Sequence, residues 1–75
     1  MEITIIEIKE KNIKAIQRYL RKWRVRRNGG ATVIEVAIKC KMSVTTAKET
    51  LEWMFRDGKV LKTHSFGSLE IQYVG

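Results

Sequence analysis

The sequence contains one cysteine, one histidine and no long apolar run, and each shortage excludes a class of protein. With Cys40 alone, no internal disulfide can form, and the chain does not offer the usual set of three or four Cys, His or carboxylate ligands that holds zinc. No stretch approaches the ~20 apolar residues of a transmembrane helix, and the first residues lack the basic start and apolar segment of a signal peptide. We therefore expect a cytoplasmic protein without a metal site or membrane contact.

Groups that could carry catalysis are equally scarce. Neither His64 nor Cys40 has a sequence context that resembles a nucleophile with its base. The sequence also lacks a Gly-rich loop of the kind that binds phosphate groups. It therefore predicts a protein that is not an enzyme, and it indicates neither a cofactor nor a small-molecule ligand.

What the chain does have is positive charge, concentrated in one segment. Its 75 residues, enough for one domain over 1–75, include 15 Lys and Arg against 8 Asp and Glu, a formal net charge of +7. Residues 9–27 carry nine of the basic side chains against Glu10 alone. Such an excess favours a polyanionic partner, although a charge run can also be an ordinary solvated helix face.

The first half of the sequence predicts a strand and a helix. Residues 2–8 are short and rich in β-branched side chains, which indicates a strand, with an N-terminal extension of the next helix as the alternative. From residue 12 to 26 an apolar stripe of Ile13, Ile16, Leu20 and Trp23 predicts one amphipathic helix. Asn and Gly at positions 28–30 then end it.

Two further helices and a β-hairpin are expected next. Thr32 and Glu35 form a capping box that begins a short second helix, which extends to residues 41–42. Ser43 is a favoured N-cap for a third helix, ending at residues 57–58, with an inward face of Ala47, Leu51, Met54 and Phe55. Residues 59–74 then predict two strands joined around Gly67, with Leu69, Ile71 and Tyr73 on one face.

This order, an α+β fold of three helices with a C-terminal hairpin and an N-terminal strand, resembles the winged helix-turn-helix of small transcriptional regulators. The resemblance rests on Ala37 within the second helix, Met42 and Ser43 closing the turn, small and apolar residues along the third helix, and the Gly58-x-Val60 step into the hairpin. Lys41 departs from the pattern, because the family often has Gly there, and it must adopt a tight-turn conformation. Small size, absence of proline and an Ile, Lys and Glu-rich composition are similar to short regulators of archaeal viruses and plasmids.

The resemblance implies sequence-specific binding of double-stranded DNA, with the third helix in the major groove. A homodimer is expected on DNA, because one recognition helix contacts only a few base pairs and because Trp53 and the Ile-rich residues 3–8 are candidates for an exposed apolar contact. The expected recognition residues are Ser43, Thr45, Thr46, Lys48 and Glu49. The hairpin, or wing, would contact phosphate or the minor groove through Lys62, Thr63, His64, Ser65 and Ser68. Further phosphate contacts are expected from Arg24, Arg26, Arg27, Lys39 and Lys41.

Several alternatives remain open at this point. Glu49 and Glu52 on the third helix repel phosphate and favour a winged-helix module that binds other proteins. The basic first helix favours an architectural protein that coats DNA or RNA without sequence preference. Trp53 lies off the inward stripe, so either the first helix or the N-terminal strand covers it or it forms a dimer contact, and Cys40 is expected to be a small buried core residue.

Overall fold

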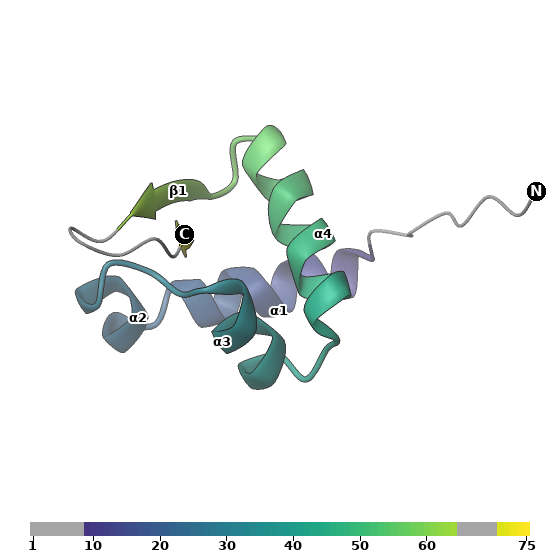
Figure 1. Cartoon of the computed structure of the whole chain (residues 1–75), viewed down its shortest axis with the longest axis horizontal. Coiled ribbons are helices and arrows are strands. Elements are labelled where there is room, and N and C mark those ends of the chain that lie inside the picture. Colours follow the sequence, from purple (N-terminus) through teal and green to yellow (C-terminus); the bar gives the residue numbers. More distant parts are fainter. Residues whose placement is uncertain (1–8, 65–70) are drawn as a thin grey trace, which may run out of the picture.

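A computed structural model describes residues 9–64 and 71–75 of the chain. This part contains four helices followed by a two-stranded antiparallel sheet, so the protein is a small α+β fold (Figure 1). The elements are α1 (Glu10–Leu20), α2 (Trp23–Arg27), α3 (Val33–Lys39), α4 (Val44–Arg56), β1 (Leu61–His64) and β2 (Ile71–Val74). The strand expected over residues 2–8 lies outside the described residues. None of the described helices is both long enough and apolar enough to cross a membrane.

The prediction of one continuous helix over 12–26 is wrong. The chain leaves the α-helix after Leu20, Lys22 takes an extended conformation, and its N–H bonds three residues back to the Tyr19 carbonyl at 3.1 Å. The apolar stripe loses its register here, so Trp23 is 69% exposed and Val25 becomes the buried residue of α2. The break lets the chain turn back towards the core, whereas a continued helix would advance by about 1.5 Å per residue away from it.

The α3–turn–α4 unit forms as the caps predict. The Thr32 hydroxyl accepts a hydrogen bond from the Glu35 N–H at 3.3 Å, and the Ser43 hydroxyl accepts one from the Thr46 N–H at 3.1 Å. Lys41 adopts the left-handed conformation (φ 56°) that the tight turn requires, and the Met42 N–H reaches back to the Ala37 carbonyl at 3.0 Å. This pattern closes the end of α3 with a Schellman motif in which Lys stands where Gly is usual.

The sheet extends beyond the hairpin by one residue pair. Leu61 to His64 pair with Val74 to Ile71, which confirms the predicted hairpin strands, and Ala31 forms an additional antiparallel bridge to Tyr73. Gly30 makes this approach possible, because it has φ 120° and a Cβ there would stand 2.5 Å from the Tyr73 carbonyl oxygen. The segment before α3 is thereby fixed against β2.

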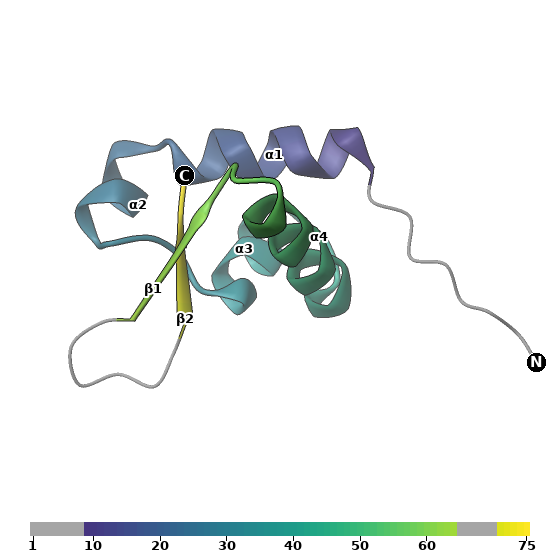
Figure 2. The same ribbon diagram turned by 90° about the horizontal axis from the view of Figure 1, so that it is seen from above.

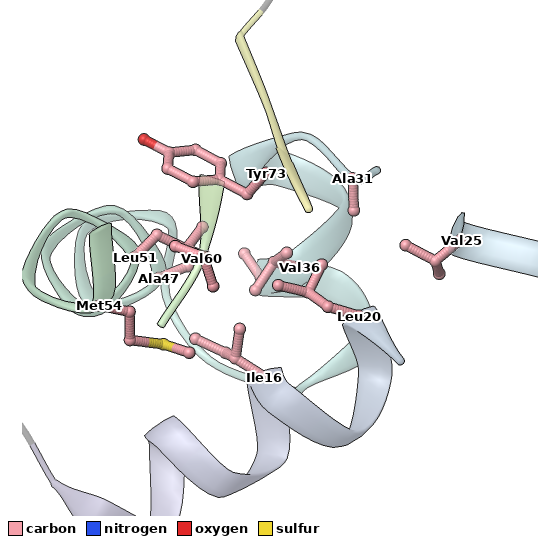
Figure 3. Packing of buried hydrophobic residues seen from close by; sticks show 11 residues of the cluster. Ile16, Leu20, Val25, Ala31, Val36, Ala47, Leu51, Met54, Val60 and Tyr73 are labelled. Carbon is pink, nitrogen blue, oxygen red and sulfur yellow. The ribbon is translucent and has the colours of Figure 1, made fainter. Parts of the chain in front are cut away.

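The core lies between α1, α3, α4 and the sheet. Figure 2 shows α1 along one edge of the domain, with α3, α4 and the hairpin on the same side of it. The close view in Figure 3 shows most of the buried cluster, which comprises Ile16, Leu20, Val25, Ala31, Val36, Ala37, Ala47, Leu51, Met54, Val60 and Tyr73.

The inward face of α4 differs from its prediction at one end. Leu51 and Met54 are fully buried and so is Thr50, which the apolar pattern missed, whereas Phe55 is 40% exposed. Phe55 lies at the edge of the stripe, where the Lys62 ammonium sits 4.6 Å from its ring centroid. The placement of Phe55 in the core is therefore wrong, since a cation from the hairpin covers it instead of the core.

Candidate nucleic-acid interface

The N-terminal half of α4 presents three exposed polar side chains, Thr45, Lys48 and Glu49. None of them makes a side-chain hydrogen bond or ion pair with another described residue. Lys48 lines a shallow depression together with Glu52, Ile71 and Tyr73 and with residues 32–34. The depression lies between α4, β2 and the start of α3. This face offers a donor, an acceptor and a methyl group to a partner, but with one Lys and one Glu it has no excess positive charge.

Ser43 and Thr46 are engaged with each other. Besides accepting from the Thr46 backbone, the Ser43 hydroxyl donates to the Thr46 Oγ1 at 2.8 Å. Both residues therefore stabilise the first turn of α4, where an unpaired N–H would otherwise face solvent. Their predicted contact with DNA bases would have to compete with this cap, whereas the side chains of Thr45 and Lys48 have no hydrogen bond to another described residue.

A compact polar network joins α4 to both strands of the hairpin. Glu52 Oε1 accepts a hydrogen bond from the Tyr73 hydroxyl at 2.7 Å and lies 2.7 Å from the Lys62 ammonium. The hydrogen bonds from Lys62 and then Tyr73 hold the pKa of Glu52 below its ordinary value, while burial and the same carboxylate raise the pKa of Tyr73. The network fixes the hairpin against α4, and it neutralises a carboxylate that would repel phosphate.

Of the residues predicted to lie in the wing, the structure describes the side chains of Lys62 and Thr63. Lys62 points its ammonium at Glu52 and over the rings of Phe55 and Tyr73, so the geometry gives it a role inside the domain. Thr63 is half-buried in β1. The side chain of His64, together with Ser65 and Ser68 and the turn around Gly67, lies outside the described residues.

The cations predicted to contact phosphate lie away from the exposed face of α4. Arg24 and Lys39 line one pocket of about 540 Å³ with Lys22, and Lys39 and Lys41 line a second of about 280 Å³ with Arg18 and Lys22. Arg26 and Arg27 are exposed on α2. In both views α3 separates α2 from α4 (Figures 1 and 2).

Arg18 and Lys22, which also line these two pockets, were not among the predicted phosphate contacts, nor were the aromatic rings beside them. Tyr19 lines both pockets and Trp23 lines the larger one. The only signal in the sequence was the interleaving of Tyr19 and Trp23 with basic residues over 18–24. That pattern could not show that Lys39 and Lys41, from another helix, complete the surface.

The remaining candidates carry little chemistry. Cys40 is half-buried against the core, and burial raises the pKa of its thiol, which disfavours the reactive thiolate. Trp53 is 39% exposed. Among the described residues no group of three His, Cys, Asp or Glu side chains is placed to hold a metal ion.

Comparison of the chain with protein-family models, with curated proteins and with solved structures finds no match.

Proposed function

We propose that the protein is a winged helix-turn-helix that binds specific sites in double-stranded DNA and regulates transcription. The N-terminal half of α4 enters the major groove, and the hairpin lies along the backbone or the adjacent minor groove. Lys48 donates to guanine, Glu49 accepts from cytosine, and the Thr45 methyl group contacts thymine. The single cysteine fits the reducing cytoplasm as the site of action.

The observation that carries this proposal is the unit formed by α3, the turn at Lys41 and the capped α4. It exposes Thr45, Lys48 and Glu49 at the helix end that can reach base edges, and no other described residue occupies their polar groups. A helix is the element that fits the width of the major groove, and residues near its N-terminus are the ones that reach the bases.

Two features of the surrounding fold support it. The order of helices, the Ala31 bridge before α3 and the hairpin after α4 is the order of elements in a winged helix. The Glu52 network also holds the hairpin against α4, so the wing and the recognition helix would meet DNA as one rigid surface. The net charge of +7 supplies the attraction to phosphate.

Selection of bound sequences from a random duplex library at near-physiological salt tests the proposal. One sequence motif should emerge, and Lys48→Ala should reduce the preference for that site over random DNA by about 1–3 kcal/mol. Lys59→Ala is the matched control, because it removes the same charge at the far end of α4, where Lys59 pairs with Asp57 at 3.4 Å. Arg26→Ala should weaken specific and random binding together.

Salt provides an independent check. Each neutralised phosphate releases about 0.9 counterion, and roughly four to eight contacts suit this charge, so affinity should fall steeply as salt rises. An affinity that stays flat between low and moderate salt would remove the DNA proposal, whatever the outcome of the selection.

We further expect a homodimer on DNA. One recognition helix contacts only a few base pairs, and a two-fold pair reading half-sites about 10 bp apart raises both affinity and specificity. Exposed apolar side chains such as Trp53 and Leu61 (39% and 68% exposed) are available for a dimer contact. Sedimentation of the complex with a selected site measures the ratio, and a 1:1 complex on every good site would exclude the dimer.

One observation favours a second candidate, a module that binds another protein. Ile34 and Ile38 lie one helical turn apart on α3 and are 59% and 68% exposed, which is unusual for a surface that faces phosphate. If the duplex selection yields no motif and Ile38→Ser leaves DNA binding unchanged, the apolar stripe on α3 becomes the better guide to function.

A further inference from the structure

The two pockets beside α1 form one continuous surface. The larger lies between the end of α1, α2 and α3, the smaller lies between α1 and the turn after α3, and they share Tyr19, Lys22 and Lys39. We call this the basic–aromatic surface and define it by Arg18, Lys22, Trp23, Arg24, Lys39 and Lys41. The depression that contains Lys48 shares no lining residue with it.

Its charge is almost entirely of one sign. Five of the six defining residues are cations, and Glu35 is the one carboxylate among the lining residues. None of the five forms an ion pair with another described residue, in contrast to Lys14, Lys59 and Lys62. Five cations gathered around one carboxylate, with no ion pair among them, repel one another, so a bound anion would stabilise the arrangement.

An aromatic ring completes the surface. Trp23 is 69% exposed although it lines the larger pocket, and the Arg27 guanidinium lies 4.9 Å from its ring centroid. Such a contact orients the indole and brings a further cation to the rim. Exposed aromatic rings set among Lys and Arg are the arrangement on which the bases of single-stranded nucleic acids stack.

The shape favours an unpaired strand over a duplex. In a duplex the flat faces of the bases are covered by their neighbours, so an indole at a convex phosphate surface gains nothing. An unpaired base can enter a hollow and stack on Trp23, and about 540 Å³ is within the range of small-ligand pockets, so it can admit a single base. The ring therefore distinguishes a strand with free bases from other polyanions.

We propose that the basic–aromatic surface binds single-stranded nucleic acid, with a base stacked on Trp23 and the flanking phosphates held by Lys22, Lys39 and the neighbouring cations. This surface is separate from the N-terminal half of α4, and binding there does not require that α4 recognises a duplex. A chain with both surfaces can hold an unpaired strand beside a duplex.

Tryptophan fluorescence tests the stacking directly. In Trp53→Phe, Trp23 is the one remaining tryptophan, and Trp53 lines neither pocket. Titration with an oligo-dT strand of about ten nucleotides should quench its emission to saturation, whereas a duplex of the same length should leave the emission nearly unchanged. Binding of oligo-dT without a change in Trp23 emission, or equal quenching by the duplex, would overturn the proposal.

Affinity for the labelled strand, measured by fluorescence anisotropy, separates stacking from general attraction. Trp23→Leu should weaken binding roughly tenfold, and Trp23→Tyr should restore most of the loss, because both rings can stack on a base. The double variant Lys22→Ala/Lys39→Ala should weaken it at least as much. Lys14→Ala/Lys59→Ala removes the same charge from two lysines that already have carboxylate partners, and it should have little effect.

Equal losses of oligo-dT affinity in the two double-lysine variants would show that only the net charge matters, and would contradict the proposal. Lys48→Ala should leave oligo-dT binding unchanged. If α4 does not recognise a sequence, the duplex selection will yield no motif, but the oligo-dT titrations will be unaffected. The two proposals are therefore tested independently.

Discussion

The α4–hairpin half and the α1–α2 half of the molecule use their charges differently. In the first, Glu52 pairs with Lys62, Asp57 pairs with Lys59, and Lys62 also covers the Phe55 ring. In the second, nine basic residues face a single carboxylate, Glu10, which pairs with Lys14 at 3.5 Å. In the α4–hairpin half, ion pairs hold the hairpin against α4. In the α1–α2 half, most of the basic side chains have no carboxylate partner and remain available to a binding partner.

Under the proposed function, this contrast separates two tasks that a DNA-binding domain often combines in one face. The exposed N-terminal half of α4 would distinguish bases, and because it carries no excess of cations it would contribute specificity more than attraction. The cations that would attract a polyanion come from α1, α2, α3 and the turn after α3, and they line pockets that share no residue with the depression around Lys48. Variants in the two halves should therefore have different signatures, in folding as well as in binding.

The largest expected effect tests the inward face of α4. Leu51→Ala should lower the free energy of unfolding by about 2–5 kcal/mol, because Leu51 is fully buried in a small core. Phe55→Ala should cost only about 1 kcal/mol, since its ring is 40% exposed and loses chiefly the contact with Lys62. Urea unfolding followed by circular dichroism measures both, and equal losses would place Phe55 in the core after all.

The next effect tests how the segment before α3 is fixed to the sheet. Gly30→Ala should destabilise the fold by about 2–4 kcal/mol, because the new Cβ would stand 2.5 Å from the Tyr73 carbonyl and the residue has φ 120°. Gly58→Ala is the control, since it also has a positive φ (75°) but no atom within 4 Å of the new Cβ, and it should cost about 1 kcal/mol. Similar losses in both would mean that the close approach to Tyr73 is not what requires Gly30.

The sequence was sufficient for the elements whose signals are local. Thr32 and Ser43 cap the helices they were expected to begin, and Lys41 takes the left-handed conformation that its place in the turn demanded. Each of these depends on hydrogen bonds within a few residues, which a pattern of residue types can reveal.

The errors occur where a distant contact decides the outcome. The break after Leu20 involves no Gly or Pro, and the segment that follows it carries Ala31 to its bridge with Tyr73, a contact that no local pattern reveals. Phe55 is at the stripe's edge, where Lys62 from the hairpin determines its environment. The basic–aromatic surface is of the same kind, because it brings Arg18, Lys22 and Arg24 together with Lys39 and Lys41, which lie at least fifteen residues later in the chain.

A smaller effect is expected from the polar network that fixes the hairpin to α4. The pKa of Glu52 is lowered in the fold, so its contribution to stability is present above its ordinary pKa of 4.5 and is lost as the pH falls through the folded value. Glu52→Gln should therefore cost about 1 kcal/mol at neutral pH and flatten the acid side of the stability curve. Glu49→Gln, on the exposed face of the same helix, serves as the control and should leave that curve unchanged.

The same network predicts that the free energy of unfolding falls at alkaline pH. The raised pKa of Tyr73 means that its contribution is present below the ordinary value of 10.0 and declines as the pH rises above it. Tyr73→Phe keeps the buried ring and should remove this decline. Unfolding monitored against pH in both variants separates the two groups, and an unaltered alkaline arm in Tyr73→Phe would show that Tyr73 does not cause it.

The smallest effect on folding has the opposite sign and connects the two halves. Lys41 is the one described non-glycine residue with positive φ, and its Cβ makes that conformation unfavourable, so Lys41→Gly should stabilise the fold by about 0.5–1 kcal/mol. The side chain nevertheless belongs to the basic–aromatic surface, and the same substitution should weaken binding of the oligo-dT strand. Lys39→Gln is the control, because it removes a charge from that surface without relieving strain, and it should weaken binding with no gain in stability. A stabilised Lys41→Gly variant that binds the strand as well as the parent would show that the strained lysine serves no function on this surface.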